Sequence, residues 1–344
     1  MQKILVVRND KIGDFMLAWP SFAMLKQSLP ESHITALVPK YTAELANQCP
    51  WIDEVIIDPT EKAGKSEYND LLNKIKAAKF DAAINLFSTT YNALLVWRAK
   101  IPFRLAPATK LAQVFYNCRI KQRRSLSQKP EFEYNLDLIR AFLTKHKVPV
   151  VEPSVPYMSF EDEALSAQKT KLSETLELDL SLPWLFIHSG TGGSSNSLSV
   201  QQYRDLVLGL DGKFEVVLTA GPGEEETAHK LASLIKEGNR KCCVYDENDG
   251  LIDFSRSLAC ADLFIAGSTG PLHISAALNV ATVGFFPAKR SSTPLRWQPI
   301  NSTERHIAFT PVGGKNKQEQ SDMTSINIES VLAELNPWAS QYLS

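Results

Sequence analysis

The chain has 344 residues, of which 44% are hydrophobic, and its formal net charge at pH 7 is -1. This length exceeds what one ordinary core needs and suits two α/β domains. The near-neutral balance excludes a global attraction to nucleic acid, so no nucleic-acid partner is expected. The five cysteines show neither a C-x-x-C nor a metal-ligand spacing, which indicates plain thiols in a reducing compartment.

The N-terminal apolar run, 4–7, is too short for a signal peptide. No stretch approaches the roughly 20 apolar residues that span a bilayer. We therefore expect a cytoplasmic protein.

The first half of the chain alternates strand and helix patterns. Strands are predicted at 3–8, 33–39, 53–58 and 81–87, and helices at 15–29, 68–79 and 131–147. Such alternation is typical of right-handed β-α-β units with a parallel sheet. The proline-rich stretch 148–157 predicts an extended linker.

The same pattern restarts after a predicted helix at 161–176. Strands are predicted at 184–188, 214–220, 242–245, 263–267 and 282–286, and helices at 200–210, 224–237, 251–260 and 271–278. We therefore predict an α/β protein of two Rossmann-like domains, 1–155 and 156–325, whose parallel sheets face across a cleft. The terminal segment 326–344, with a helix at 326–335, is expected to pack back on the first half.

Ligands of open α/β sheets bind beyond the carboxyl ends of the strands, so the loop after each half's first strand is a candidate site. In the first half, Gly13 permits a tight turn and Asp14 lies near a helix N-terminus. Asp14 is either a helix cap or a general base, and position alone favours the cap. The loop lacks G-x-G-x-x-G, and so does the second half, which argues against an oxidoreductase.

The second half has two loops rich in glycine and hydroxyl groups, 188–195 and 267–273, each directly after a strand. Such loops offer backbone amides to phosphate oxygens, and two in one half favour a diphosphate site. Glu224 follows another strand and is either a ribose ligand or an ordinary first-turn acid. No D-x-D pair is present, so amides, hydroxyls and basic side chains, rather than a metal ion, are expected to neutralise the diphosphate.

Residues 98–129 concentrate positive charge and contain no acid. This segment either faces an anionic partner, such as a phosphorylated lipid, or is a solvated surface. Its basic residues are Arg98, Lys100, Arg104, Lys110, Arg119, Lys121, Arg123, Arg124 and Lys129.

Two motifs together resemble signatures of a known family. Asn9–Asp14, followed by Ala18-Trp19-Pro20, resembles the N-terminal signature of glycosyltransferase family 9, and 267–278 resembles its nucleotide-binding signature. The resemblance implies the GT-B fold and a cytoplasmic enzyme that moves heptose from ADP-heptose to the lipopolysaccharide inner core, with inversion and without metal or other cofactor. A lipid-linked acceptor further implies peripheral contact with the inner membrane.

The resemblance also implies residue roles, with Asp14 as the catalytic base. The implied donor-binding residues are Ser189, Thr191, Gly192, Asn196, Glu224, Ser268, Thr269, Gly270 and His273, and the implied acceptor-binding residues are Lys11, Arg119, Lys121, Arg123 and Arg124. Ser268 stands where the family often has Asp, and Asn196 stands where many members have a lysine. Lys289, Arg290 or Arg296 would then supply the missing positive charge.

Three alternatives remain open at this level. The first is a family 9 transferase with another ADP-sugar or acceptor, and the second is a sugar-nucleotide epimerase. The third is a degenerate nucleotide-binding protein that has lost turnover with the lysine at position 196.

Overall fold

The computed structural model describes residues 2–109, 111–192, 196–314 and 316–344. The chain divides into two compact units, Met1–Tyr157 and Met158–Ser344, two residues beyond the boundary expected from the sequence. None of the described helices is long and apolar enough to cross a membrane.

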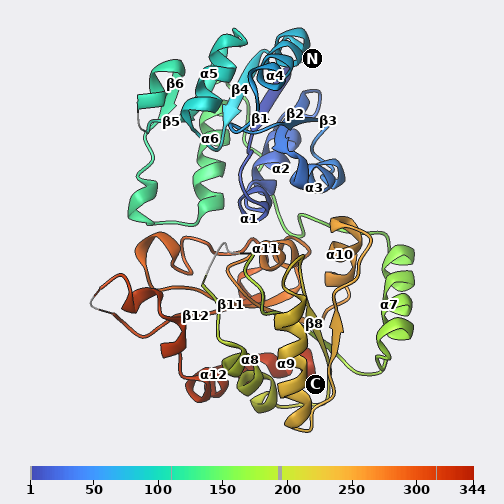
Figure 1. The fold of residues 1–344 in the computed structure, drawn as a ribbon. Coiled ribbons are helices and arrows are strands. Elements are labelled where there is room, and N and C mark those ends of the chain that lie inside the picture. Colours follow the sequence, from blue (N-terminus) through green and yellow to red (C-terminus); the bar gives the residue numbers. More distant parts are fainter. Residues whose placement is uncertain (1, 110, 193–195, 315) are drawn as a thin grey trace. The chain divides into compact units, whose positions relative to one another are not determined.

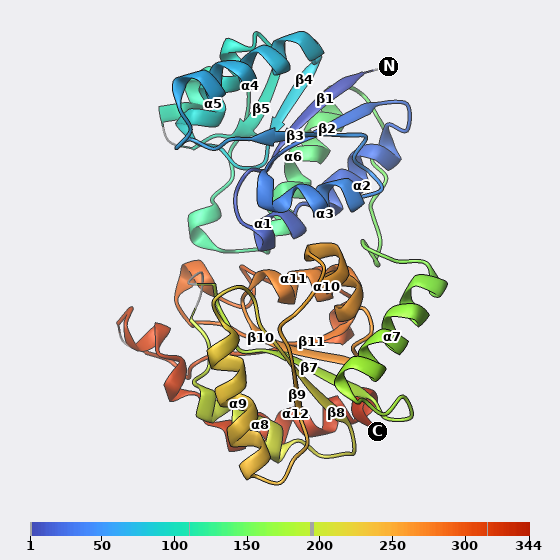
Figure 2. The same ribbon diagram turned by 45° about the vertical axis from the view of Figure 1, so that its right-hand side comes forward.

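The first unit is a six-stranded parallel sheet between helices, with strand order β3-β2-β1-β4-β5-β6. Figure 1 and Figure 2 show α4 and α5 on one face and α2 and α6 on the other. Strands β1, β2 and β4, in the middle of the sheet, are largely buried on both faces, as their continuous apolar runs require, whereas the edge strands β3 and β6 are partly exposed. Its elements are β1 (Lys3–Val7), α1 (Ile12–Met16), α2 (Trp19–Ser28), β2 (His33–Pro39), α3 (Ala43–Gln48), β3 (Glu54–Asp58), α4 (Lys65–Ala78), β4 (Ala82–Asn85), α5 (Thr90–Arg98), β5 (Phe103–Pro107), β6 (Cys118–Ile120) and α6 (Glu131–Lys145).

The second unit repeats this plan, with strand order β12-β11-β10-β7-β8-β9, again parallel throughout. Helices α8, α9 and α12 pack on one face, and α7, α10 and α11 on the other (Figure 2). Its elements are α7 (Asp162–Leu176), β7 (Trp184–His188), α8 (Val200–Gly209), β8 (Glu215–Thr219), α9 (Glu225–Glu237), β9 (Cys243–Tyr245), α10 (Leu251–Leu258), β10 (Leu263–Gly267), α11 (Gly270–Ala277), β11 (Ala281–Phe285), β12 (His306–Phe309) and α12 (Ile328–Leu343).

Both sheets therefore have the same topology around their first strand. The chain adds two strands on one side of β1, then crosses to β4 on the other side, and β7 and β10 stand in the same relation. In open α/β sheets this point of reversal leaves a crevice beyond the strand ends, where ligands bind. The loops after β1 and β7 lie at these points.

Two expected elements differ from the observed ones. The single helix predicted at 15–29 is two helices, α1 and α2, because Pro20 stands in the first turn of α2, where it cannot continue a helix from before it. Helix α12 runs to Leu343, well beyond the end expected at residue 335. Its apolar side chains Val331, Leu335 and Ala339 are buried in the second unit's own core, against α8.

Candidate active site

A buried arginine organises the loop at the reversal point of the first sheet. Arg8 follows β1 directly, and three carboxylates surround its guanidinium. Its Nη2 lies 2.6 Å from Asp14 Oδ1, its Nε 2.9 Å from Asp10 Oδ1 and its Nη1 3.3 Å from Glu131 Oε1. Burial alone would lower the pKa of Arg8, but the three carboxylates more than offset it and raise the pKa above its ordinary value. The arginine is thus a fixed positive charge at the site.

The surroundings of Asp14 raise the affinity of its carboxylate for a proton. Asp14 is the third residue of α1, and its side chain is only 18% exposed. Burial raises its pKa; Arg8 opposes that rise, and the Glu131 carboxylate adds to it. A carboxylate with a raised pKa accepts a proton more readily, while the short contact with Arg8 fixes its orientation.

Asp10 is the second carboxylate of this cluster. Burial raises its pKa to about 7, against the attraction of Arg8. The cluster joins the three carboxylates of Asp10, Asp14 and Glu131 to two guanidinium groups, those of Arg8 and Arg124. One carboxylate is therefore in excess of the two guanidinium groups, and Asp10 is the one whose pKa burial raises to about 7.

Glu131, the first residue of α6, links this cluster to the basic segment. Its Oε1 lies 2.6 Å from Arg124 Nη1, and Arg124 also donates to the Leu86 carbonyl at 3.3 Å and, through Nε, to Gln122 Oε1 at 2.9 Å. The sequence placed Arg124 among residues facing an anionic acceptor. The structure pairs it with the buried Glu131 carboxylate, and its side chain stays 17% exposed.

The other expected acceptor residues remain on the surface. Lys11, Arg119, Lys121 and Arg123 are all exposed. Lys11 precedes α1 and is close enough to favour the ionised form of Asp14, as the weakest of that group's influences. Lys121 and Arg123 line a cavity of about 570 Å³ together with Ile120, Gln122, Gln128, Lys129, Tyr134, Asp137 and Arg140. Lys110 lies outside the described residues.

Polar residues to which the sequence analysis assigned no role also converge at this strand edge. Asn9 donates to an oxygen of Asp58 at the end of β3, and the Asn9 and Asn92 amides exchange two hydrogen bonds of 2.8 Å. Tyr91 donates to the other oxygen of Asp58 at 2.7 Å. This network anchors the 8–14 loop to α5. The one feature of the sequence that could have indicated these residues is that each of them ends a strand, follows a strand or begins a helix.

In the second unit, Glu224 holds the loop after β7. Its Oε1 accepts a hydrogen bond from the Gly192 amide at 2.6 Å, and its Oε2 accepts one from the Gly221 amide at 3.1 Å and lies 3.3 Å from His188 Nε2. The contact with His188, with these two amides, lowers the pKa of Glu224 to about 2. A Cβ on Gly190 would stand 2.1 Å from this carboxylate, so a larger residue there would push the Glu224 side chain away.

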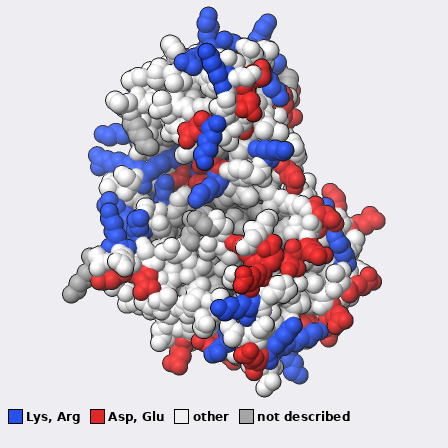
Figure 3. Space-filling view, viewed as in Figure 1, with Lys and Arg blue, Asp and Glu red and all other residues white. Residues whose placement is uncertain are grey.

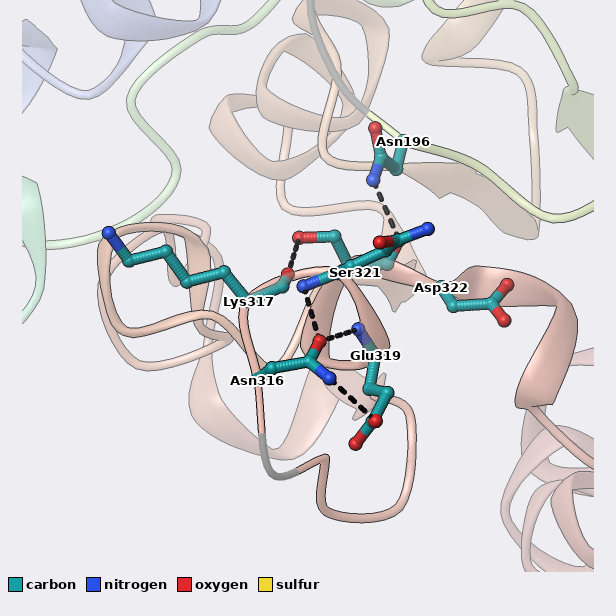
Figure 4. A pocket seen from close by; sticks show the side chains of 7 residues that line it. Asn196, Asn316, Lys317, Glu319, Ser321 and Asp322 are labelled. Atoms are coloured by element: carbon teal, nitrogen blue, oxygen red, sulfur yellow. Dashed lines mark hydrogen bonds between the residues drawn. The ribbon is translucent and has the colours of Figure 1, made fainter.

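A cavity of about 620 Å³ opens beside this loop. Asn196 lies on its wall, and its Nδ2 donates to the Ser321 carbonyl at 2.7 Å (Figure 4). A neighbouring cavity of about 860 Å³ shares Asn196, Ser321 and Asp322 and is otherwise lined by Asn316, Lys317, Gln318 and Glu319. The first cavity is lined by Ser189, Gly190, Thr191, Asn196, Ser197, Leu198, Gly223, Glu224, Thr227, Ser321, Asp322, Met323 and Thr324. Residues 193–195 of the expected loop lie outside the described residues.

The loop after β10 adjoins the same region. A Cβ on Gly267 would lie 3.2 Å from Ser197 Oγ, so the two loops are in close contact. Thr269 precedes α11, and its buried Oγ1 has no hydrogen-bond partner within the described part of the chain; neither has the buried Nδ1 of His273. Burial, with the neighbouring His306, lowers the pKa of His273 to about 3, so its imidazole is neutral. Ser268 is partly exposed beside them.

The two units thus offer different chemistry at equivalent strand ends. The first presents a buried guanidinium and a carboxylate suited to accept a proton. The second presents backbone amides, hydroxyls and a neutral imidazole, which suit phosphate oxygens. Among the described residues no group of three or more His, Cys, Asp or Glu side chains is placed to hold a metal ion.

Comparisons with known proteins place this arrangement in a family. The model of glycosyltransferase family 9 (heptosyltransferase) matches residues 69–326. A Haemophilus influenzae protein described only as a glycosyltransferase is 54% identical over 338 residues, which cover 98% of this chain and 96% of that protein.

Solved structures agree in fold. The Escherichia coli ADP-heptose lipopolysaccharide heptosyltransferase II has a TM-score of 0.77 at 20% identity and covers 99% of both chains. The E. coli heptosyltransferase WaaC with ADP has a TM-score of 0.72 at 18% identity, covering 98% of this chain and 100% of that one. The two parallel sheets are accordingly the two Rossmann-like domains of a GT-B fold. The chain belongs to glycosyltransferase family 9, the heptosyltransferase family, and is a glycosyltransferase.

Proposed function

We propose that this enzyme transfers a heptose from ADP-heptose to the inner core of lipopolysaccharide, with inversion and without a metal ion. The family and the named E. coli relatives support the donor and acceptor classes. The observation that carries the chemistry is the Asp14 carboxylate, fixed 2.6 Å from a buried guanidinium at the reversal point of the first sheet. Because such an acceptor is lipid-linked, we propose that the enzyme works in the cytoplasm, against the inner membrane.

In this mechanism Asp14 is the general base. It takes the proton of an acceptor sugar hydroxyl as that oxygen bonds to the anomeric carbon. The bond from the anomeric carbon to the diphosphate oxygen breaks, and ADP leaves with the electron pair. Arg8 is a positioning residue, because it orients Asp14 and keeps it ionised until the proton arrives.

The second unit holds the donor. The amides of the 189–192 loop and the Thr269 hydroxyl are the groups we assign to the diphosphate, whose negative charge grows as the bond breaks. The neutral His273 sits beside them. Glu224 shapes this loop through its bonds to Gly192 and Gly221, and we assign it the ribose as well.

Asn196 stands where many family members have a lysine, and nearby lysines could supply the positive charge in its place. Asn196 donates to the Ser321 carbonyl, and the preceding carbonyl, that of Gln320, accepts a bond of 2.8 Å from the Ala288 amide. Lys289 directly follows Ala288, whose amide holds the segment that Asn196 contacts, and Lys317 lines the adjoining cavity. We assign neutralisation of the leaving diphosphate to these two lysines.

On the acceptor side, Lys11 stands next to the base, and Lys121 and Arg123 line the basic cavity. We assign these side chains, with Arg119, to the anionic groups of the acceptor core.

The test is a transfer assay with purified protein, ADP-heptose and a lipopolysaccharide core acceptor that lacks the heptose, with the product identified by mass. The expected result is one added heptose per acceptor and release of ADP, unaffected by a chelator. No transfer from ADP-heptose, with transfer from another ADP-sugar, would establish the alternative that the replacement at Asn196 favours, a family 9 enzyme with a different donor. Thermal-shift titrations with ADP, UDP and GDP separate the nucleotide choice from turnover, since only a bound nucleotide stabilises the fold.

A further inference from the structure

Two exposed aromatic residues flank the loop that carries Asp14. Tyr41 is 54% exposed and Phe87 is 36% exposed, and together with Trp97 they are the most exposed Phe, Tyr and Trp residues in the described part of the chain. Tyr41 follows β2 and Phe87 follows β4, and these are the two strands that pair with β1. Because the three strands are parallel, the two aromatic residues stand on either side of the loop after β1, at the same edge of the sheet.

The side chain of Tyr41 is fixed beside the candidate base. Its hydroxyl donates to the Asp10 carbonyl at 2.7 Å, and the 3₁₀ helix Lys40–Thr42 that carries it packs against α1, the helix of Asp14. Burial, and then the charges of Asp10 and Asp14, raise the pKa of the Tyr41 hydroxyl. The hydroxyl therefore keeps its proton and its bond to the loop, while about half of the residue remains exposed.

Phe87 is held by the charged cluster on the other side of the loop. The carbonyl of the preceding residue, Leu86, accepts hydrogen bonds from Arg8 at 3.5 Å and from Arg124 at 3.3 Å. The carbonyl of Phe87 itself accepts one from Asn92 at 3.0 Å. The backbone before and after the ring is thus fixed, and the fold leaves the ring partly exposed.

Charged side chains match only part of what an acceptor core offers. Figure 3 shows Lys and Arg gathered along one edge of the first unit, where they suit anionic groups. A pyranose ring also has a face of C–H groups, which are apolar and weakly positive, and the face of an aromatic ring is weakly negative. Aromatic side chains therefore suit the sugar ring itself, which charged groups cannot hold.

We infer that Tyr41 and Phe87 bind the terminal pyranose ring of the acceptor between them, and so select the sugar that the proposed base reaches. Neighbouring strands lie about 4.8 Å apart, so the ends of β2 and β4 stand about 10 Å apart, which admits one sugar ring in contact with a side chain on each side. A ring held in this way has few orientations left, which directs one hydroxyl to Asp14. The inference rests on the proposed function, because it needs Asp14 to act on a hydroxyl of that sugar.

Steady-state kinetics with ADP-heptose and a deacylated core oligosaccharide that lacks the heptose test this inference. Tyr41→Leu and Phe87→Leu keep apolar bulk but remove the aromatic ring, and each is expected to raise the acceptor KM by about tenfold. The donor KM, the melting temperature and the ADP-induced thermal shift should stay as in wild type. The increase should be equal at low and high sodium chloride, because the lost contact involves no net charge. Trp97→Leu, at the third exposed ring, is the matched control and should leave the acceptor KM unchanged.

Tyr41→Phe separates contact with the sugar from support of the loop. It keeps the ring but loses the bond to the Asp10 carbonyl, so its acceptor KM should stay close to that of wild type. An acceptor KM as high in Tyr41→Phe as in Tyr41→Leu would overturn the role of the Tyr41 ring, because the hydroxyl would then be the group that matters.

Two further outcomes separate this inference from the proposed function. An acceptor KM unchanged in both leucine variants, with normal transfer by wild type, would overturn the inference and leave the proposed function standing. Wild-type protein that neither binds the core oligosaccharide in isothermal titration nor extends it would contradict the proposed function, and this inference with it.

Discussion

The loops after β1 and β7 occupy equivalent places in two sheets of identical topology, yet they hold opposite kinds of chemistry. The first loop concentrates ionised groups around Arg8, and the second offers amides and hydroxyls shaped by Glu224. In the first, burial raises the pKa values of Asp10 and Asp14 against the attraction of Arg8. The contrast teaches that the shared strand order supplies only a position, and that the residues after the strand decide which chemical groups stand there.

The largest expected effect comes from removing the proposed general base while leaving the second unit unchanged. Asp14→Asn keeps the shape of the side chain but removes its basicity. We expect kcat/KM to fall by about 10³-fold, within the range for loss of a general base. The ADP-induced thermal shift, which reports on the second unit, should not change. Transfer rates within a few-fold of wild type would contradict the assignment of Asp14.

The next effect tests whether Arg8 acts through Asp14. Arg8→Met leaves buried carboxylates without their partner and should lower the free energy of unfolding by about 3–5 kcal/mol. Arg8→Lys keeps the charge and should recover most of that stability. Arg8 lowers the pKa of Asp14. A weaker contact from the substituted side chain should therefore raise that pKa and move the acidic limb of the pH dependence of kcat/KM to higher pH. An unshifted limb in Arg8→Lys, with a lower rate, would mean that Arg8 is merely structural.

Glu224→Gln tests the proposed role of the loop after β7 in binding the donor. The amide group cannot accept hydrogen bonds from Gly192 and Gly221 at both ends, so the loop should lose its shape. We expect the Kd for ADP to rise by about tenfold, with little change in the pH profile of turnover. Isothermal titration measures the former, and an unchanged Kd would remove Glu224 from the site.

The Glu224→Gln variant should also change how the stability of the protein depends on pH. The pKa of Glu224 is about 2 in the fold against an ordinary 4.5. Its contribution to stability is therefore complete above pH 4.5 and is lost as the pH falls toward 2. After allowance for solvent screening this amounts to about 1–2 kcal/mol. Wild type should lose this stability in acid unfolding, and Glu224→Gln should not.

A last prediction concerns the pH dependence of stability that Asp10 causes. The Asp10 pKa of about 7, against 3.8 ordinarily, means that the folded protein keeps a proton that the unfolded chain releases. Wild-type stability from this group is therefore complete below pH 3.8 and declines as the pH rises to about 7. Asp10→Asn cannot ionise, so its melting temperature relative to wild type should rise between pH 4 and 8. A constant difference would show that Asp10 is ionised throughout.

Much of the fold could be read from local pattern. Strands β2, β7 and β10 begin and end where the apolar runs predict, because a strand buried on both faces has few polar positions. The short strands β5, β6 and β12 and the helices α3 and α5 were not predicted. β6 is three residues long, and it exists because β5 offers it an edge to pair with. Such strands carry no periodicity of their own.

The candidate site was predictable only in part. Asp14, Glu224 and the 267–273 loop stand after strands, where topology makes side chains converge. The ion pair between Arg124 and Glu131 could not be predicted, since the sequence neighbours of Arg124 are exposed bases and only the fold brings the buried carboxylate beside it. Asn196 binds the carbonyl of Ser321, 125 residues away, which no local pattern indicates.

The sequence by itself determined the alternation of strand and helix, the two halves, the family and the loops that follow each first strand. These features depend on local composition and spacing, which the chain carries in any conformation. Only the tertiary structure decided the coupling of three carboxylates to Arg8, the capture of the 189–192 loop by Glu224 and the exposure of Tyr41 and Phe87. Charge coupling and exposure are properties of distances between residues remote in sequence, and only folding sets those distances.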